Sequence, residues 1–373
     1  MPKTSRIFVF LEIFSREGGI QSYVKDIFQA YLELSDTESD SAEVFLLRDS
    51  AADHNPYETT ELKFHYFKSS SAWQGRLKLA YYLFTCLLLR RPCHVYCGHI
   101  YLAPLIYKLC KPLGIPYTIL TYGKEVWERL PDNHRKALQQ ASAIWTIGRY
   151  SRERLTKAND IKSDRVSILP CVVDETVFTP GEKPQALITK YGLENSRVLM
   201  TVARLWSGDI YKGVDVTIRA LPQILQVFPE VKYLVIGRGD DLPRLQTLAQ
   251  DLEVSDRVIF AGFVPTAELV DHYRVADAYI MPSQEGFGIV YLEAMACGKP
   301  VLSGDADGSL DPLQDGNLGW RVPHRNPDAV AAACLEILQY SDRRCDGQWL
   351  REQTIAKFGK NALKQQLQVL LSR

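Results

Sequence analysis

The chain has 373 residues, and its 44 lysines and arginines balance 44 aspartates and glutamates, so its formal net charge is zero. A protein without surplus positive charge is unsuited to coating nucleic acid or another polyanion, and we expect no nucleic-acid partner. Apolar residues make up 46% and charged residues 24% of the chain, which excludes intrinsic disorder and a coiled coil.

The first part of the chain alternates short apolar runs with helical patterns, which is typical of βαβ units and a parallel sheet. The run 7–14 predicts the first strand, and the spacing of apolar residues after Gly18 and Gly19 predicts a helix. Further strands are expected at 44–47, 94–97, 117–121, 144–147 and 166–169. We therefore expect residues 1–177 to form one Rossmann-like domain.

A second series of the same kind follows a segment at 178–184 whose two prolines and one glycine predict a linker. Its strands are expected at 198–203, 233–236, 258–261, 278–281 and 300–303. The last helical residues, 350–373, are expected to pack back on the first domain. The fold class is thus α/β, with two doubly wound domains, 1–177 and 178–349, facing each other across a cleft. Ligands of such sheets bind beyond the carboxyl ends of the strands.

The apolar runs also bear on location. The first run is interrupted by Glu12, and the longest, residues 79–89, is much shorter than the roughly 20 residues that span a bilayer. We expect a cytoplasmic protein. The eight cysteines show neither a CxxC pair nor zinc-ligand spacing, so we expect reduced core cysteines and no metal.

Three glycine-bearing turns could approach a phosphate. Gly18 and Gly19 open the first helix, where backbone amides and the helix dipole favour an anion. The turn 237–239 starts like a dinucleotide fingerprint, but Leu242 replaces its third glycine, so a plain strand-to-helix turn is favoured. The third turn, 285–288, carries the most information.

That third turn lies between a strand and the helix predicted at 289–296. Glu285 and Glu293 flank backbone amides at the helix start, so acceptors for hydroxyls and donors for phosphates occur together. Arg204 and Lys212 follow another strand end and could clamp a diphosphate. The alternative is ordinary surface charge around a capped helix.

Several runs together resemble glycosyltransferase family 4, the retaining enzymes with the GT-B fold. In the second half these are VARL (202–205), YKGVD (211–215), IRAL (218–221), LVIGRG (234–239), VIFAGFV (258–264), ADAYIMPS (276–283) and EGFGIVYLEAMACGKPV (285–301). In the first half they are GG (18–19), YGKEVW (122–127) and PCVVDETVF (170–178).

The resemblance implies a retaining hexosyltransferase whose second domain binds a UDP-, GDP- or ADP-sugar. Arg204 and Lys212 would bind the diphosphate, and Glu293 the ribose hydroxyls. The transferred sugar would lie against the 285–290 loop, namely Glu285, Gly286, Phe287, Gly288, Ile289 and Val290. The backbone at Gly18 and Gly19 would meet the phosphates. The acceptor would be a glycan or a lipid-linked glycan in polysaccharide or glycolipid synthesis, and no metal or other cofactor is implied.

One position departs from the family pattern. Many relatives carry a histidine where this chain has Tyr122. His99, at the end of the preceding strand, could take over that contact, or it could be a packed strand-end residue. Asp305 and Asp307 form a D-x-D pair like the manganese ligands of the other major glycosyltransferase fold, but we expect no metal role for them here.

Two other functions share some of these features. A dinucleotide-dependent oxidoreductase also has Rossmann-like domains, but the fingerprint at 237–242 is incomplete. A catalytically inactive sugar-nucleotide-binding protein would have no need of the intact charged residues.

Charge is unevenly distributed in the first half. Residues 62–124 contain no aspartate or glutamate but nine lysines and arginines. Within this segment the apolar stretch 77–89 is flanked by basic residues, namely Arg76, Lys78, Arg90 and Arg91. Such a stretch could be a buried helix with basic ends, or it could attach the protein peripherally to an anionic membrane. Both interpretations stay open.

Overall fold

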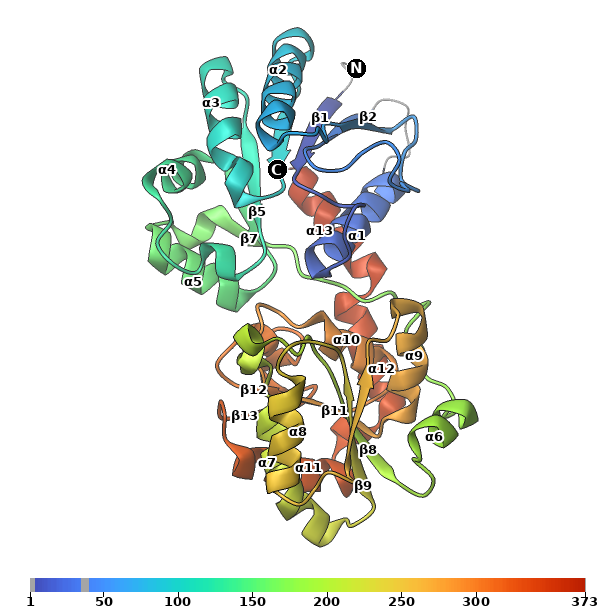
Figure 1. The fold of residues 1–373 in the computed structure, drawn as a ribbon. Coiled ribbons are helices and arrows are strands. Elements are labelled where there is room, and N and C mark those ends of the chain that lie inside the picture. Colours follow the sequence, from blue (N-terminus) through green and yellow to red (C-terminus); the bar gives the residue numbers. More distant parts are fainter. Residues whose placement is uncertain (1–3, 35–39, 373) are drawn as a thin grey trace. The chain divides into compact units, whose positions relative to one another are not determined.

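The computed structural model describes residues 4–34 and 40–372, which divide into two compact units (Figure 1). The first unit contains the chain up to Cys171 together with its end from Lys360 onward, and the second contains Val172–Gly359. The division at Cys171 falls a few residues before the predicted boundary at 177. None of the helices described is long and apolar enough to cross a membrane.

The first unit is built on a seven-stranded parallel sheet in the order β3-β2-β1-β4-β5-β6-β7. Its strands are β1 (Thr4–Phe10), β2 (Asp40–Leu46), β3 (Leu62–Tyr66), β4 (His94–Cys97), β5 (Tyr117–Thr121), β6 (Ala143–Thr146) and β7 (Val166–Ile168). Its helices are α1 (Gly19–Leu34), α2 (Ala72–Arg90), α3 (Ala103–Leu113), α4 (Asp132–Gln140), α5 (Arg149–Asn159) and α13 (Lys360–Leu371).

Side chains of β1 alternate between the two faces of this sheet and contact different helices on each face. Successive side chains of a strand point to opposite faces. Phe8 and Phe10 meet aromatic rings of α1, with ring centroids 5.5 Å apart for Phe8 and Tyr31. Ile7 and Val9 instead join the buried cluster that contains the inner residues of α2 and α3. One strand thus supplies both layers of the core.

The second unit has a six-stranded parallel sheet in the order β10-β9-β8-β11-β12-β13. Its strands are β8 (Arg197–Val202), β9 (Val231–Ile236), β10 (Val258–Gly262), β11 (Ala278–Met281), β12 (Val301–Gly304) and β13 (Trp320–Val322). Its helices are α6 (Gln185–Tyr191), α7 (Val214–Val227), α8 (Leu242–Asp251), α9 (Thr266–Val275), α10 (Ile289–Ala296), α11 (Pro327–Leu338) and α12 (Gly347–Phe358).

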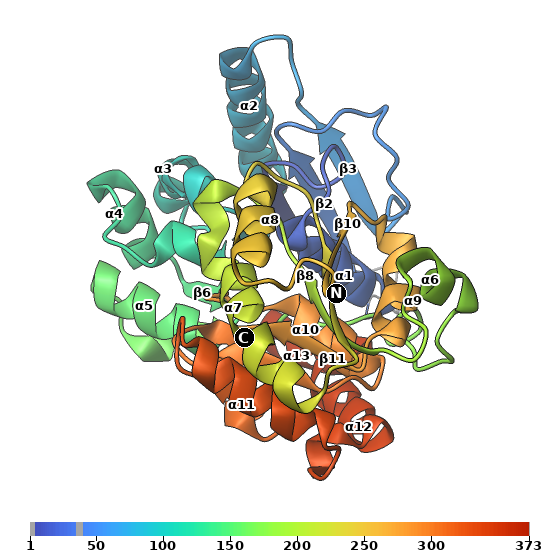
Figure 2. The ribbon, with the colours of Figure 1, turned by 60° about the horizontal axis from the view of Figure 1, so that its bottom comes forward.

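Helices cover both faces of this second sheet. α7 and α11 lie side by side on one face (Figure 2). On the other face Tyr279 of β11 lies between Tyr273 of α9 and Tyr291 of α10, with ring centroids 5.8 and 5.9 Å away. All eleven predicted strands occur, with ends shifted by a few residues. Two short strands, β3 and β13, were not predicted.

The predicted C-terminal helix is interrupted. Gly359 separates α12, which packs on α10 in the second unit, from α13, which packs on α1 in the first. A Cβ at Gly359 would lie 2.7 Å from the carbonyl oxygen of Ile355, so a glycine suits this break. Only α13, rather than the whole range 350–373, belongs to the first unit.

Candidate functional site

The predicted charged residues of the second unit gather where the strand order reverses. β8 and β11 are neighbours, and the chain winds outward from them in opposite directions. Arg204 follows β8, and Glu285 follows β11. In doubly wound sheets this position, beyond the carboxyl ends of the two strands, is where ligands bind.

An ion pair between Lys212 Nζ and Glu285 Oε1 joins the loops after these strands. Lys212 ends a short 3-10 helix, Ser207–Lys212, that is anchored on the other loop by the amide of Gln284, which donates to Tyr211 O at 3.1 Å. Gly213 follows with φ of 75°, and a Cβ there would lie 2.5 Å from Pro282 O. The close approach of the two loops therefore depends on a glycine.

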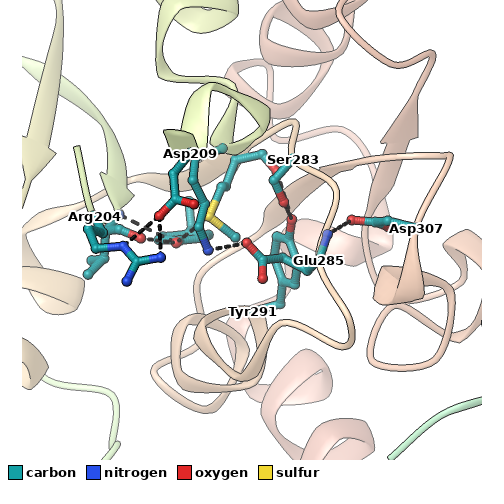
Figure 3. Close-up of polar contacts among 10 residues, drawn as sticks. Arg204, Asp209, Ser283, Glu285, Tyr291 and Asp307 are labelled. Atoms are coloured by element: carbon teal, nitrogen blue, oxygen red, sulfur yellow. Dashed lines mark hydrogen bonds and ion pairs between the residues drawn. The ribbon is translucent and has the colours of Figure 1, made fainter. Parts of the chain in front are cut away.

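Arg204 projects from the same edge and is held by Asp209. Its Nε donates to Asp209 Oδ2 at 2.5 Å (Figure 3). Its guanidinium lies 5.4 Å from the ring centroid of Trp206. The Arg204 side chain is 65% exposed, whereas that of Asp209 is 5% exposed. A buried carboxylate thus orients a guanidinium that stays open to a ligand.

The turn 237–239 supports this loop by packing. A Cβ on Gly237 would lie 1.8 Å from Ala203 O, and one on Gly239 would lie 1.8 Å from Leu205 O. The amide of Leu205 also donates to Arg238 O at 3.1 Å. These glycines are needed because the turn contacts the chain around Arg204 closely. Residues 237–239 thus form a plain strand-to-helix turn, as we predicted.

Asp307 fixes the Glu285 loop from the other side. Its Oδ2 accepts the Glu285 N–H at 2.6 Å (Figure 3). Its Oδ1 accepts the Ser309 N–H at 2.9 Å. Burial raises the pKa of Asp307 to about 6, and these donors partly offset that shift. Asp307 therefore acts on the loop's backbone, while Asp305 accepts the amide of His324 at 3.2 Å. Within residues 4–34 and 40–372 no group of three or more potential metal ligands occurs.

α10 begins directly after this loop. Gly288 has φ of 92°, and its left-handed conformation turns the chain into the helix at Ile289. The first backbone amides of a helix have no partner within it, so the residues from Phe287 to Val290 present donors near Glu285. The Phe287 ring is buried and lies 5.8 Å from that of Phe358.

Glu293 lies further along α10, partly buried. Its Oε2 accepts a hydrogen bond from the Tyr273 hydroxyl at 2.7 Å. Burial raises the pKa of Glu293 to about 7, although this hydrogen bond favours the ionised form. The carboxyl group therefore changes charge close to neutral pH.

The remaining predicted residues lie in the first unit. Gly18 and Gly19 are exposed at the start of α1, and a Cβ on Gly19 would meet no atom within 4 Å. The loop before them is fixed by Asp49, a fully buried carboxylate that the sequence analysis missed. Asp49 accepts the amides of three successive residues, Ile13, Phe14 and Ser15, at 2.6–3.1 Å. The contact expected between Gly18–Gly19 and a donor stays a prediction.

Tyr122 is a packed residue. It is buried, its hydroxyl donates to Gly98 O at 2.7 Å, and its ring lies edge-on to Tyr23 at 5.9 Å. His99 is only partly buried, and its Nδ1 accepts the Tyr101 amide at 3.2 Å. Burial lowers the pKa of His99 to about 4, so at neutral pH the imidazole is uncharged and carries its proton on Nε2.

Two mannosyltransferases are similar in sequence to this chain. A GDP-mannose-dependent alpha-(1-6)-phosphatidylinositol monomannoside mannosyltransferase of Mycolicibacterium smegmatis is 35% identical over 231 residues, and the chain spans only 59% of its length. A GDP-mannose-dependent monoacylated alpha-(1-6)-phosphatidylinositol monomannoside mannosyltransferase of Corynebacterium glutamicum is 28% identical over 350 residues. That alignment covers 88% of this chain and 87% of the relative.

Solved structures show the same architecture. The crystal structure of Anabaena HepE in complex with UDP has a TM-score of 0.80 to this chain, at 18% identity, and the match covers 99% of both chains. At this identity the likeness concerns the fold, and it confirms the predicted GT-B fold with two Rossmann-like domains. A family model described as Glycosyl transferases group 1 matches residues 196–340. The predicted resemblance is confirmed: residues 196–340, within the second unit, match the family of glycosyl transferases group 1.

Proposed function

We propose that this protein is a retaining glycosyltransferase that moves a hexose from a nucleotide-sugar to a lipid-linked or glycan acceptor. The observation that carries the proposal is the ion pair of Lys212 and Glu285 at the strand-order reversal, directly before the N-terminus of α10. A cation and free amides suit a diphosphate, and a carboxylate suits sugar hydroxyls.

In the proposed reaction the bond from the sugar C1 to the diphosphate oxygen breaks, and the acceptor hydroxyl oxygen bonds to C1 on the same face. The hydroxyl proton passes to the departing diphosphate oxygen. Positive charge then develops on the sugar and negative charge on the leaving diphosphate. Arg204 and Lys212 stabilise that negative charge, and they make a metal ion unnecessary. Glu285 moves from Lys212 to the sugar hydroxyls when the diphosphate takes over the ammonium.

The proposed donor is GDP-mannose and the proposed acceptor a phosphoinositol-type glycolipid. Two of the relatives are named as GDP-mannose-dependent enzymes that act on phosphatidylinositol mannosides. The solved neighbour holds UDP, so the nucleotide base is the feature to test first. Glu293 would accept the ribose hydroxyls of whichever nucleotide binds.

We further propose that the first unit attaches to the cytoplasmic face of an anionic membrane through α2. One face of α2 is buried through Leu79, Leu83 and Leu87. The opposite face exposes large apolar side chains at helical spacing, namely Trp73, Leu77, Tyr81, Phe84 and Leu88. Of the flanking cations, Arg90 is paired with Glu43, which leaves Arg76, Lys78 and Arg91 for lipid headgroups. The buried-helix interpretation accounts for only one face.

Thermal denaturation with GDP, UDP, ADP and NAD tests the donor assignment, because a ligand that binds only the folded protein stabilises it. We expect GDP to raise the melting temperature most, and to do so in the presence of EDTA. Stabilisation by NAD alone would indicate the oxidoreductase alternative. Stabilisation by GDP without transfer to any acceptor would indicate an inactive sugar-nucleotide-binding protein.

A further inference from the structure

The first unit contains an apolar groove, whereas the charged site residues Arg204, Lys212 and Glu285 belong to the second unit. The groove has a volume of about 880 Å³, and its walls are α2 on one side and the start of α3 with the preceding turn on the other. Pockets of about 300–1,000 Å³ accommodate small-molecule ligands. α2 and α3 lie side by side in the same unit (Figure 1). The groove is therefore defined within one compact unit.

The position of the groove relative to the sheet is informative. Leu11 and Leu47 line it, and they directly follow the carboxyl ends of β1 and β2. Leu102, shortly after β4, lines it too. The groove thus begins at the sheet edge where doubly wound domains bind their ligands, and it extends outward along α2.

The groove combines apolar walls with positive charge. Trp73, Leu77, Ala80 and Leu105 are among its apolar lining residues. Three cationic side chains also line it, namely Arg48, Arg76 and Lys108, and no aspartate or glutamate does.

The three cations differ in their partners. Arg48 lies 3.6 Å from Glu12, which is outside the groove. Among the described residues no ion pair or side-chain hydrogen bond involves Arg76 or Lys108, which lie on opposite walls. An apolar ligand alone would leave these charges without a counter-ion. The combination therefore fits a ligand that has both a hydrocarbon chain and a negative charge.

We propose that this groove binds one hydrocarbon chain of an anionic lipid acceptor, whose phosphate is neutralised by Arg76 and Lys108. The proposal rests on the lipid-directed transfer proposed above and specifies where the acceptor's chain lies. It differs from attachment through the outer face of α2: Trp73 and Leu77 belong to both surfaces, but Tyr81, Phe84 and Leu88 do not line the groove. A lipid held in this way would present its headgroup at the carboxyl edge of the sheet.

The test uses the whole chain without nucleotide and a single-chain anionic phospholipid, lysophosphatidylglycerol, below its critical micelle concentration. A diazirine on the chain end allows crosslinked residues to be mapped by mass spectrometry. We expect crosslinks within residues 73–80 and 101–108 and saturable binding. An alkyl maltoside of equal chain length should bind more weakly, because it carries no charge. Crosslinks elsewhere, or equal binding of the maltoside, would overturn the proposal.

Two variants sharpen the test. Ala80→Trp fills the groove and should weaken lysophosphatidylglycerol binding by about tenfold or more. Arg76→Gln should weaken it by about two- to fivefold, the scale of a partly solvated charge contact. Lys157→Gln, on the exposed surface of α5 in the same unit and outside the groove, should leave the affinity unchanged. Wild-type affinity in both Ala80→Trp and Arg76→Gln would contradict the assignment.

This binding assay separates the groove from the transfer reaction. Normal lipid binding without any glycosyl transfer would contradict the proposed function and leave the groove assignment standing. Transfer to a lipid acceptor without binding in the groove would contradict only the groove assignment. A melting temperature within a few degrees of wild type confirms that Ala80→Trp is folded.

Discussion

Lys212 and Glu285 are 73 positions apart in the sequence, and their side chains form an ion pair at the point where the strand order of the second sheet reverses. The two groups that we assign to the diphosphate and to the sugar therefore neutralise each other in the absence of substrate. Each side chain is about four-fifths buried, so the ion pair between them is largely shielded from solvent. A bound diphosphate would replace the carboxylate as the partner of Lys212 and release Glu285 for the sugar.

Glu285→Gln tests the role of that carboxylate. The amide keeps the size of the side chain but removes its charge, so we expect kcat to fall by about 10²-fold or more, as for loss of one preorganised transition-state contact. The measurement is the initial rate of transfer at saturating donor. Circular dichroism of the variant checks its fold, and turnover close to wild type would show that Glu285 has no part in catalysis.

Removal of either cation should weaken nucleotide binding. We expect Arg204→Ala and Lys212→Ala each to cost about 1.5–3 kcal/mol of binding free energy for the nucleoside diphosphate, the scale of a charge-assisted hydrogen bond. Titration calorimetry in EDTA measures this loss. Arg219→Ala, on exposed helix surface in the same unit, is the control and should bind normally. Binding that disappears in EDTA and returns with manganese would contradict the proposed independence from metal ions.

Gly213→Ala tests the approach of the two loops. Gly213 and Gly262 both have φ of 75°, but only Gly213 would place a Cβ against a backbone oxygen, at 2.5 Å from Pro282 O. We expect Gly262→Ala to lower the free energy of unfolding by about 1–2 kcal/mol through its backbone conformation alone. Gly213→Ala should cost more and should also weaken nucleotide binding. Equal losses in urea denaturation of the two variants would show that the contact with Pro282 is unimportant.

Because the pKa of Glu293 is raised to about 7, both the nucleotide affinity and the stability of the protein should depend on pH. The ionised carboxylate is the stronger acceptor for ribose hydroxyls, so nucleotide affinity should rise between pH 6 and pH 8. The folded protein binds this proton more tightly than the unfolded chain does. The contribution of Glu293 to stability is therefore fully present below about pH 4.5 and is lost as the pH rises through 7.

Glu293→Gln should flatten both profiles, because the amide does not titrate. Calorimetry of GDP binding and urea denaturation at pH 5, 6, 7 and 8 measure them. An unchanged rise of affinity with pH in Glu293→Gln would assign that dependence to another group.

Flotation with vesicles that contain an anionic phospholipid tests attachment through α2. We expect the protein to float with these vesicles at low salt and less at high salt, because screening weakens the attraction of Arg76, Lys78 and Arg91 to the headgroups. The triple variant Tyr81→Gln, Phe84→Gln, Leu88→Gln should remain at the bottom of the gradient. Val227→Gln, an exposed apolar residue of the second unit, should float like wild type. Flotation of the triple variant would show that the outer face of α2 does not attach the protein to the membrane.

The sequence was sufficient for the parts of the fold that depend on local patterns. The helix predicted at 289–296 has those bounds in the structure, because Gly288 and Gly298 both have the left-handed conformation that glycine favours. The loops that carry Lys212 and Glu285 were also placed at strand ends correctly. β13 was missed because its three residues, Trp320 to Val322, include an arginine and form no apolar run.

Contacts between distant segments could not be predicted in the same way. Asp307 was noted only as part of a D-x-D pair, and its hydrogen bond to the Glu285 amide depends on how β11 and β12 lie next to each other. Asp49 shows no local signal at all, since the three amides it accepts lie about 35 residues earlier in the chain. The charge pattern of residues 62–124 indicated an unusual segment, but only the packing of α2 shows which of its faces is exposed.

Retaining hexosyl transfer at the Arg204–Lys212–Glu285 site leaves its mark on the product, whose anomeric configuration can be measured. The protein is incubated in EDTA with GDP-mannose and an inositol glycolipid acceptor, and the new linkage is examined by nuclear magnetic resonance. We expect a mannosyl product with the same α configuration as the donor, formed by the wild type and largely lost in Lys212→Ala. A β-linked product, or equal product formation by Lys212→Ala, would contradict retaining transfer at this site.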